Sequence, residues 1–425
     1  MTRTMKDSGI DWIGDVPEDW DVNRTKNYYT NHKDIVGDLA NSYERLALTL
    51  NGVIKRSKED STGLQPEAFD GYQILRQNEL VFKLIDLENV STSRVGLCPF
   101  ESGIVSPAYI VLTPRENINP KYSEYYYLSM WHREIFNHIG DDGVRSSLNA
   151  KDLLNVPITV PSMPEQEKIA DFLDEKCSHI DSVLEKTRAS IEEYKQLKQS
   201  VITKAVTKGI RPNQPMKDSG IEWIGEVPED WDVKKIGHLF TLRNERNDLP
   251  EDEVTLLSLY TGIGVFPSGE HYTASGNHAQ TVEGYKVVRK NDIVVNIILA
   301  WMGAIGVSDY DGVTSPAYDV YTPDLKKVIP HFYHYVFRTS AIAGECYKYG
   351  RGIMMMRWRT YAPEFKQIRI PFPPISIQQQ IADYLDLKCA EIDKIITKKE
   401  QLVEELETYK KSLIYEYVTG KKEVC

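Results

Sequence analysis

The sequence lacks the features of a membrane or secreted protein. No apolar run reaches the roughly 18 residues that a membrane span requires, and no cationic start is followed by an apolar segment, as in an export signal. The five cysteines form no CxxC pair and no framework spacing, so a disulfide scaffold is not expected. These absences favour a cytoplasmic protein that makes no contact with a membrane.

Common catalytic motifs are also missing. The chain contains no GxxxxGK[ST], HExxH or GxSxG sequence, and no Asn/Asp-Pro-Pro-aromatic tetrapeptide of the kind found in amino-group methyltransferases. Three glycines at positions 262, 264 and 269 do not have GxGxxG spacing, and they predict a hairpin turn rather than a phosphate-binding loop. We therefore expect neither catalytic activity nor a cofactor.

Positive charge is scarce. The chain has 51 Lys and Arg against 62 Asp and Glu, which gives a formal net charge of -11. Domains that coat nucleic acid by bulk attraction are usually basic. Any contact with nucleic acid must therefore be confined to local basic surfaces.

What the sequence does contain is a long internal repeat. The phrase MKDSGIDWIGDVPEDWDV at residues 5–22 returns as MKDSGIEWIGEVPEDWDV at residues 216–233, with only two substitutions, both Asp to Glu. GYQILRQNELV and VSPAYIVLTP then recur, in order, as GYKVVRKNDIV and TSPAYDVYTP. These apolar segments bounded by Gly, Pro and Asn predict strands, and the aromatic segments that begin at Pro120 and Pro330 predict helices. Each half therefore opens with an α+β domain.

Each half closes with a long helical pattern. Apolar or small residues in alternating steps of three and four run through residues 173–205 and 385–417, a heptad pattern typical of helices that meet along a seam. A continuous helix from about residue 166 to 208 would be ~65 Å long. Because each helix joins the end of one domain to the next copy of the phrase, the two helices can pack together only in antiparallel fashion, about a pseudo-twofold axis.

The repeat also predicts where the ends of the chain meet. The second copy of the phrase follows the first helix across KGIRPNQP, whereas the first copy has no helix before it in sequence. Under twofold symmetry, residues 5–22 must lie against the end of the second helix, near Thr419 and Gly420. Trp12 and Trp20 are large enough to anchor the phrase on a domain face.

The repeat provides an internal control for functional residues, because a residue that carries an activity of the module is expected in both copies. His331 and His334 stand three apart on a predicted helix and align with Lys121 and Glu124. A zinc site needs a full set of ligands. No metal site is therefore expected at these histidines.

Basic loops are the remaining candidates for function. Arginine pairs bidentately with guanine or grips phosphate, and a loop such as YGRGIMMMRWRTY combines Arg with Gly and Trp in the way that a DNA groove requires. The candidate DNA-binding residues are Lys55, Arg56, Arg94 and Arg145 in the first half and Arg243, Arg246, Arg351, Arg357 and Arg359 in the second. A solvated or ion-paired role is the alternative for each of them.

Two elements, the repeated phrase and the Gln-x-x-Ile-Ala-Asp-(Phe/Tyr)-Leu-Asp start of each long helix, carry a family resemblance. With them, the chain resembles the DNA-specificity subunits of type I restriction-modification systems over essentially its full length. The resemblance implies two pseudo-twofold-related α/β target-recognition domains, separated by two long antiparallel coiled-coil helices. The implied division is recognition domains at residues 1–158 and 216–370, with spacer helices at residues 159–215 and 371–425.

The resemblance also implies a function and partners. Each domain would read one half of a split, asymmetric site in double-stranded DNA, and the helix length would set the gap. The subunit would be non-catalytic, docking two adenine-specific DNA methyltransferase subunits, with restriction (translocase/nuclease) subunits completing the complex. A protein-interaction scaffold, favoured by the acidic charge, and an orphan or degenerate specificity subunit remain alternatives. A free-standing enzyme is disfavoured by the missing motifs.

Overall fold

The computed structural model describes residues 3–60, 68–87, 92–139, 147–269, 282–352 and 358–424. The chain forms two compact units: unit 1 comprises Met1–Arg188 with Gln401–Cys425, and unit 2 comprises Ala189–Glu400. Each unit therefore contains one half of the repeat together with a part of each long helix. The contacts given below are all internal to one unit.

Unit 1 combines short strands with helices. Its strands are β1 (Met5–Asp7), β2 (Asp15–Pro17), β3 (Asp21–Arg24), β4 (Tyr29–Asn31), β5 (Leu46–Thr49), β6 (Gly52–Lys55), β7 (Gln73–Arg76), β8 (Leu80–Phe82), β9 (Val95–Leu97), β10 (Ser102–Val105), β11 (Ile110–Pro114) and β12 (Pro157–Val160). Its helices are α1 (Pro120–His132), α2 (Ala150–Asn155), the first part of α3 (Met163–Lys208) and the last part of α7 (Ile375–Val418).

Unit 2 repeats this order. Its strands are β13 (Met216–Asp218), β14 (Glu226–Pro228), β15 (Asp232–Lys235), β16 (Phe240–Leu242), β17 (Leu257–Tyr260), β18 (Gly264–Pro267), β19 (Lys286–Val288), β20 (Ile293–Asn296), β21 (Ile305–Val307), β22 (Gly312–Thr314), β23 (Tyr318–Pro323) and β24 (Arg369–Phe372). Its helices are the last part of α3, α4 (Pro330–Phe337), α5 (Ser340–Tyr349), α6 (Ala362–Phe365) and the first part of α7 (Ile375–Val418).

Strand pairing is duplicated as closely as the sequence. A four-stranded antiparallel sheet has the order β4-β11-β8-β9 in unit 1 and β16-β23-β20-β21 in unit 2. Each of the two-stranded pairs β1-β2, β3-β12, β5-β6 and β7-β10 likewise has its counterpart in β13-β14, β15-β24, β17-β18 and β19-β22. The prediction of a duplicated α+β domain is confirmed.

The central strand of each sheet is buried on both faces. Leu80 and Phe82 of β8 point into a core with the tyrosines of α1, where the Phe82 and Tyr127 rings meet edge to face at 5.0 Å. Val81, between them, packs in a second core with Leu48 of β5. Successive side chains of a strand point to opposite faces, so a strand with apolar residues at every position must be covered on both sides.

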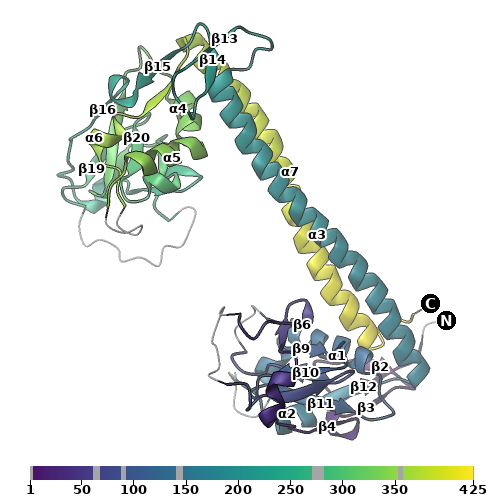
Figure 1. Cartoon of the computed structure of the whole chain (residues 1–425). Helices are drawn as coiled ribbons and strands as arrows, with labels where there is room; N and C mark the ends of the chain where they lie inside the picture. Colours follow the sequence, from purple (N-terminus) through teal and green to yellow (C-terminus); the bar gives the residue numbers. More distant parts are fainter. Residues whose placement is uncertain are drawn as a thin grey trace. The chain divides into compact units, whose positions relative to one another are not determined.

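The long helices pack in antiparallel fashion within each unit (Figure 1). In unit 1, Lys410 of α7 pairs with Asp181 of α3 at 2.6 Å; in unit 2, Lys198 of α3 pairs with Asp393 of α7 at 2.6 Å. These are matching positions of the repeat, so each ion pair is the counterpart of the other. The heptad pattern of the sequence did not predict these ion pairs.

The repeated phrase packs where twofold symmetry requires. The Lys421 ammonium, just beyond α7, donates to the carbonyl oxygens of Ile13 at 2.7 Å and Asp15 at 3.0 Å. A Cβ on Gly420, which has a φ of +70°, would lie 2.3 Å from Pro17, so glycine is required for this close approach. In unit 2, Lys208 at the end of α3 donates to the Glu226 carbonyl at 3.3 Å. The predicted contact between the phrase and the second helix is confirmed.

The two ends of the described chain also lie together. Arg3 and Val424 line one small cavity of about 240 Å³, and Arg3 pairs with Glu165 at 2.5 Å. Trp20 is buried, with 1% of its surface exposed, and donates its indole N–H to the same Glu165 at 3.0 Å. Trp20 is therefore the anchor that the sequence predicted, whereas Trp12 is only half-buried.

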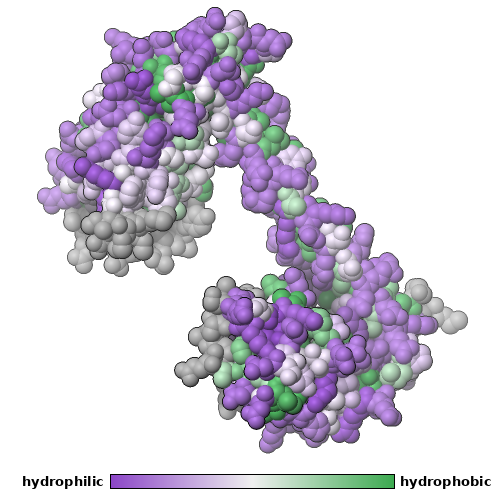
Figure 2. Space-filling model, in the orientation of Figure 1, coloured by the Kyte–Doolittle hydropathy of each residue, from purple (hydrophilic) through white to green (hydrophobic). Residues whose placement is uncertain are grey.

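The face drawn in Figure 2 is largely hydrophilic, with small apolar areas between polar side chains. Among the described residues, no helix combines the length and the apolar character needed to cross a membrane.

Candidate nucleic-acid interface

Duplication separates structural residues from candidate ligand-binding residues. Where a side chain makes the same contact in both units, that contact belongs to the shared fold. Tyr125 donates to Asp174 at 2.6 Å in unit 1, and Tyr335 donates to Asp386 at 2.6 Å in unit 2. A residue that differs between the units is not needed for the shared fold, so it is a candidate for binding a ligand that differs between the two units.

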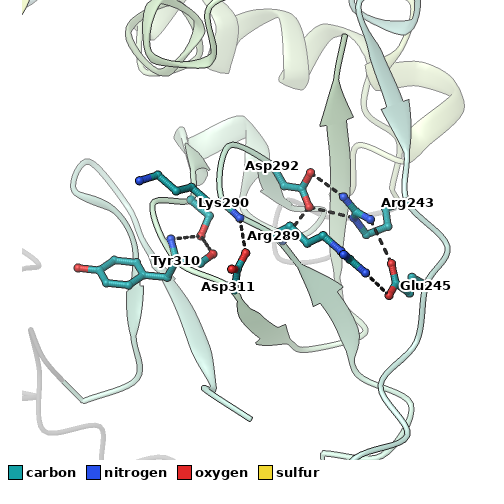
Figure 3. Close-up of polar contacts among 8 residues, drawn as sticks. Arg243, Glu245, Arg289, Lys290, Asp292, Tyr310 and Asp311 are labelled. Atoms are coloured by element: carbon teal, nitrogen blue, oxygen red, sulfur yellow. Dashed lines mark hydrogen bonds and ion pairs between the residues drawn. The ribbon is translucent and has the colours of Figure 1, made fainter. Parts of the chain in front are cut away.

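Arg243 lies in an ion-pair network that unit 1 duplicates in part (Figure 3). It donates to both carboxylate oxygens of Asp292, at 2.9 and 3.0 Å, and to Glu245 at 3.1 Å, which in turn accepts from Arg289 at 2.7 Å. The hydrogen bonds to Asp292 raise the pKa of Arg243, and only 15% of its side chain is exposed. Arg243 thus fastens the turn before β20 to the start of the domain.

The matching turn of unit 1 is held in place without a counterpart of Arg243. Arg76 pairs with Asp34 at 2.7 Å, as Arg289 pairs with Glu245, and the Glu79 carboxylate accepts from the Arg76 backbone N–H at 2.7 Å. His32 occupies the strand position that matches Arg243. The pair between the turn and the domain start is therefore structural in both units.

Arg94 does not lie on an exposed loop, so the expectation of a basic surface residue is wrong for this position. It is fully buried, with 0% of its surface exposed, and it donates to the Asp86 carbonyl oxygen at 2.5 Å. Burial lowers the pKa of its guanidinium. The side chain holds a backbone turn together and is enclosed by the domain.

Three further candidates lie at the surface with partners of their own. Lys55 is exposed at the end of β6, 5.5 Å from the Phe100 ring. Arg56 pairs with Asp60 at 2.7 Å. Arg246 donates to the Gly284 carbonyl at 3.1 Å. It lines a hollow of about 470 Å³ whose other walls include Glu245, Asp248, Glu253 and Asp311. These acidic walls disfavour a phosphate beside Arg246.

Arg351 and Arg359 are brought together. Their backbones form an isolated antiparallel bridge, with N–H to carbonyl distances of 2.9 and 3.0 Å. The Arg351 side chain is 67% exposed, pairs with Glu364 at 3.1 Å and lies over the Tyr361 ring at 5.2 Å. The remaining candidates, Arg145 and Arg357, lie outside the described residues.

An aromatic cluster beside Arg351 was not expected from the sequence. Trp301, Tyr347 and Trp358 come from three separate segments of unit 2, and the Tyr347 and Trp358 rings stack with their centroids 5.1 Å apart. The sequence signal was Trp358 itself, because Trp301 lies far from it along the chain and Tyr347 belongs to the preceding helix α5. These rings are the strongest ligand-binding feature near the candidate arginines.

No metal or cofactor site emerges from the described residues, among which no three His, Cys, Asp or Glu side chains cluster as metal ligands. His331 contacts Asp386 at 2.7 Å, and burial lowers the pKa of His334 to about 3. Lys121, aligned with His331, contacts Asp174 at 3.1 Å in the same way. The two histidines therefore occupy structural positions of the repeat.

Comparison with known proteins assigns this arrangement to a family. Residues 52–193 and 228–407 match the family model described as type I restriction modification DNA specificity domain. A Methanocaldococcus jannaschii protein, the type I restriction enzyme MjaVIII specificity subunit, is 24% identical over 360 residues, covering 82% of this chain and 80% of the relative. A second specificity subunit from that organism, MjaX, is 25% identical and covers 96% of this chain and 95% of the relative.

Solved structures share the fold. One, from work on complex assembly and conformational transition of the type I R-M system, has a TM-score of 0.69 at 13% identity and covers 96% of this chain and 99% of its own. The HsdS subunit from Thermoanaerobacter tengcongensis has a TM-score of 0.53 at 13% identity and covers 96% of this chain and 98% of its own. Both similarities extend over almost the whole of each chain.

Proposed function

The chain belongs to the family of type I restriction-modification DNA specificity subunits, and on this premise we propose that it reads a split DNA site with two unlike halves. Residues 1–158 read one half and residues 216–370 read the other. The spacer helices at residues 159–215 and 371–425 set the gap between them. The observation that carries the proposal is a duplicated scaffold that presents different side chains in each copy.

Specific positions support this division. The hydrogen bond from Leu148 N–H to the Leu84 carbonyl, 2.8 Å, matches that from Thr360 N–H to Ile297, 3.0 Å, so both copies anchor the preceding loop alike. Within the loop, Arg359 of the second copy stands where the first copy has Ser147. Two readers built on one scaffold need this combination, because base contacts specify sequence whereas the scaffold only positions them.

The chain itself performs no chemistry. It docks two adenine-specific DNA methyltransferase subunits, and restriction subunits with translocase and nuclease activity complete the assembly in the cytoplasm. The net charge of -11 agrees with this division of labour, because methyltransferase subunits that share the grip on DNA leave the reader to supply positive charge only at the bases.

The proposal is tested by a chain that carries the first reader twice. Residues 216–370 are replaced by the matching residues 5–158, and the chimera is assembled with its methyltransferase on a library of random duplexes. Because the duplicated sequence predicts two readers in opposite orientations, the chimera is expected to select an inverted repeat of a single half-site. Retention of the native asymmetric site would overturn the assignment of one reader to each half.

A further inference from the structure

Unit 2 carries a group of three aromatic rings with a neighbouring methionine, which we call the aromatic platform: Trp301, Met302, Tyr347 and Trp358. Trp301 and Met302 belong to the short helical turn Ala300–Met302, and Tyr347 to α5. The Trp301 and Tyr347 rings lie 6.2 Å apart, and the Tyr347 and Trp358 rings stack at 5.1 Å. Three separate segments thus build one surface.

Backbone contacts hold the two tryptophans in place. The Trp358 indole N–H donates to the Tyr347 carbonyl at 3.0 Å, and that of Trp301 donates to the Ile298 carbonyl at 3.0 Å. A Cβ on Gly350 would lie only 2.4 Å from the Trp358 indole nitrogen. The ring therefore occupies space that only a glycine leaves open, and the platform is ordered before any ligand arrives.

The platform is exposed more than packing alone requires. Tyr347 is 47% exposed and Met302 53%, and Leu299 and Tyr349 beside them on the same elements are each 37% exposed. A contiguous exposed group of large apolar side chains marks an interaction site more reliably than single exposed residues do.

Cations border the platform. The side chain of Arg351 is 67% exposed and that of Lys348 is 64%, whereas their carboxylate partners Glu364 and Glu345 are only 23% and 13% exposed. The cations therefore protrude further than the anions that pair with them. Flat apolar rings with protruding cations suit a ligand that has both ring faces and negative charge, as a nucleic acid has.

Among the described residues, the platform has no counterpart in unit 1. Counted back from the matching residues Leu148 and Thr360, the sequence of unit 1 has Ser146 in place of Trp358, and the short turn Ile135–His138 replaces the helix α5. A partner that docks identically on both halves would need the same surface twice. The platform therefore serves a ligand that differs between the halves, which, on the proposed function, is the DNA half-site.

We propose that Tyr347 and Met302 press against the faces of bases in the half-site read by unit 2, so that this half-site is unstacked at a step that has no counterpart in the other half-site. Apolar wedges placed against a base step unstack it partially and kink the duplex. This inference rests on the proposed function and adds a mode of contact to it, because the arginines alone would grip base edges and phosphates without unstacking.

The experiment uses the native chain assembled with its methyltransferase, and duplexes that carry 2-aminopurine at single positions of either half-site. At positions away from the adenines that the methyltransferase subunits flip, native complex is expected to raise the fluorescence in the unit 2 half-site only. Tyr347→Ala is expected to abolish that rise and to weaken binding by about 10- to 100-fold, the range of one stacking contact. It retains the backbone carbonyl that holds Trp358. Tyr347→Phe, which keeps the ring, is expected to behave as native, and Met302→Ala to lose part of the rise.

A matched control is Leu249→Ala, which truncates another apolar side chain of unit 2 that is 46% exposed; it is expected to leave the fluorescence unchanged. If the native complex binds its site and Tyr347→Ala binds equally well, the platform inference fails and the proposed function stands. If Tyr347→Ala instead prevents assembly with the methyltransferase in the absence of DNA, the platform is a protein contact and the inference is overturned. If the native complex selects no duplex, the proposed function fails as well.

Discussion

Lengthening both long helices by whole heptads tests whether they set the gap in the DNA site. The insertion points are fixed by the structure: between Arg188 and Ala189 in α3, and between Glu400 and Gln401 in α7, where the two units divide. These are matching positions of the repeat, so each unit keeps all of its own residues. Whole heptads preserve the face that each helix presents to the other.

The expected magnitude follows from helix and duplex geometry. Three heptads add 21 residues and ~32 Å to each helix. This is close to one duplex turn of ~34 Å, so the gap is expected to grow by about nine or ten base pairs while both half-sites stay on the same face of the DNA. One heptad adds ~10 Å, about three base pairs, which rotates one half-site by about a third of a turn. This variant is expected to bind far more weakly.

The assay is selection from random duplexes by the assembled methyltransferase complex, followed by sequencing. The three-heptad variant should recover both native half-sites with the longer gap, and the one-heptad variant should recover few sites. If the three-heptad complex still selects the native gap, the helices do not set the gap, because ~32 Å of added helix cannot then lie between the readers.

Three further predictions concern single features. Arg351→Ala is expected to cost about 1 to 3 kcal/mol of DNA binding if Arg351 pairs with a base and to relax sequence preference in one half-site only; equal relaxation in both halves, measured by competition with substituted duplexes, would contradict the assignment. A circular permutant is opened within residues 209–215, and its ends are joined near Arg3 and Val424. It is expected to assemble and select the same half-sites, since those ends line one cavity. A permutant that folds but does not assemble would argue against the adjacency of the two ends. Burial lowers the pKa of His132 from 6.5 to about 4, so the unfolded chain binds a proton at this imidazole more readily than the folded chain does. The free energy of unfolding therefore falls as the pH drops from about 6.5 towards 4, by up to about 1.4 kcal/mol per pH unit. His132→Ile, the residue found at the matching position in unit 2, should reduce this loss in urea unfolding at pH 7 and pH 5, and an unchanged loss would exclude His132 as its source.

Much of the fold was predictable because the repeat constrains it twice. The phrase at residues 5–22 had no helix before it in sequence, and symmetry alone placed it at the end of α7, where Lys421 now holds the Ile13 carbonyl at 2.7 Å. The antiparallel helices followed from the same argument. The ion pairs of Lys198 and Lys410 could not be predicted in this way. A heptad pattern is read from apolar positions along one helix, and it does not reveal an acid and a lysine that meet across two helices.

The candidate interface was less accessible to sequence reasoning. The sequence suggested a surface position for Arg94 because a fully buried arginine is rare. In the structure, backbone carbonyls converge on its guanidinium. The platform was missed since Trp301, Tyr347 and Trp358 meet only in the folded unit and have no aromatic counterparts in unit 1. Comparison of the two halves identifies the residues of their common fold, whereas recognition of two unlike half-sites depends on residues that differ between the halves.

The most direct test of two unlike readers on one duplicated scaffold is the DNA sequence that the native complex selects. The complete chain, assembled with its methyltransferase, is incubated with random duplexes, and the bound fraction is sequenced. The account predicts two unlike short motifs separated by a gap of fixed length and unrestricted sequence. A single continuous motif, or no enrichment by a complex that has assembled, would contradict it.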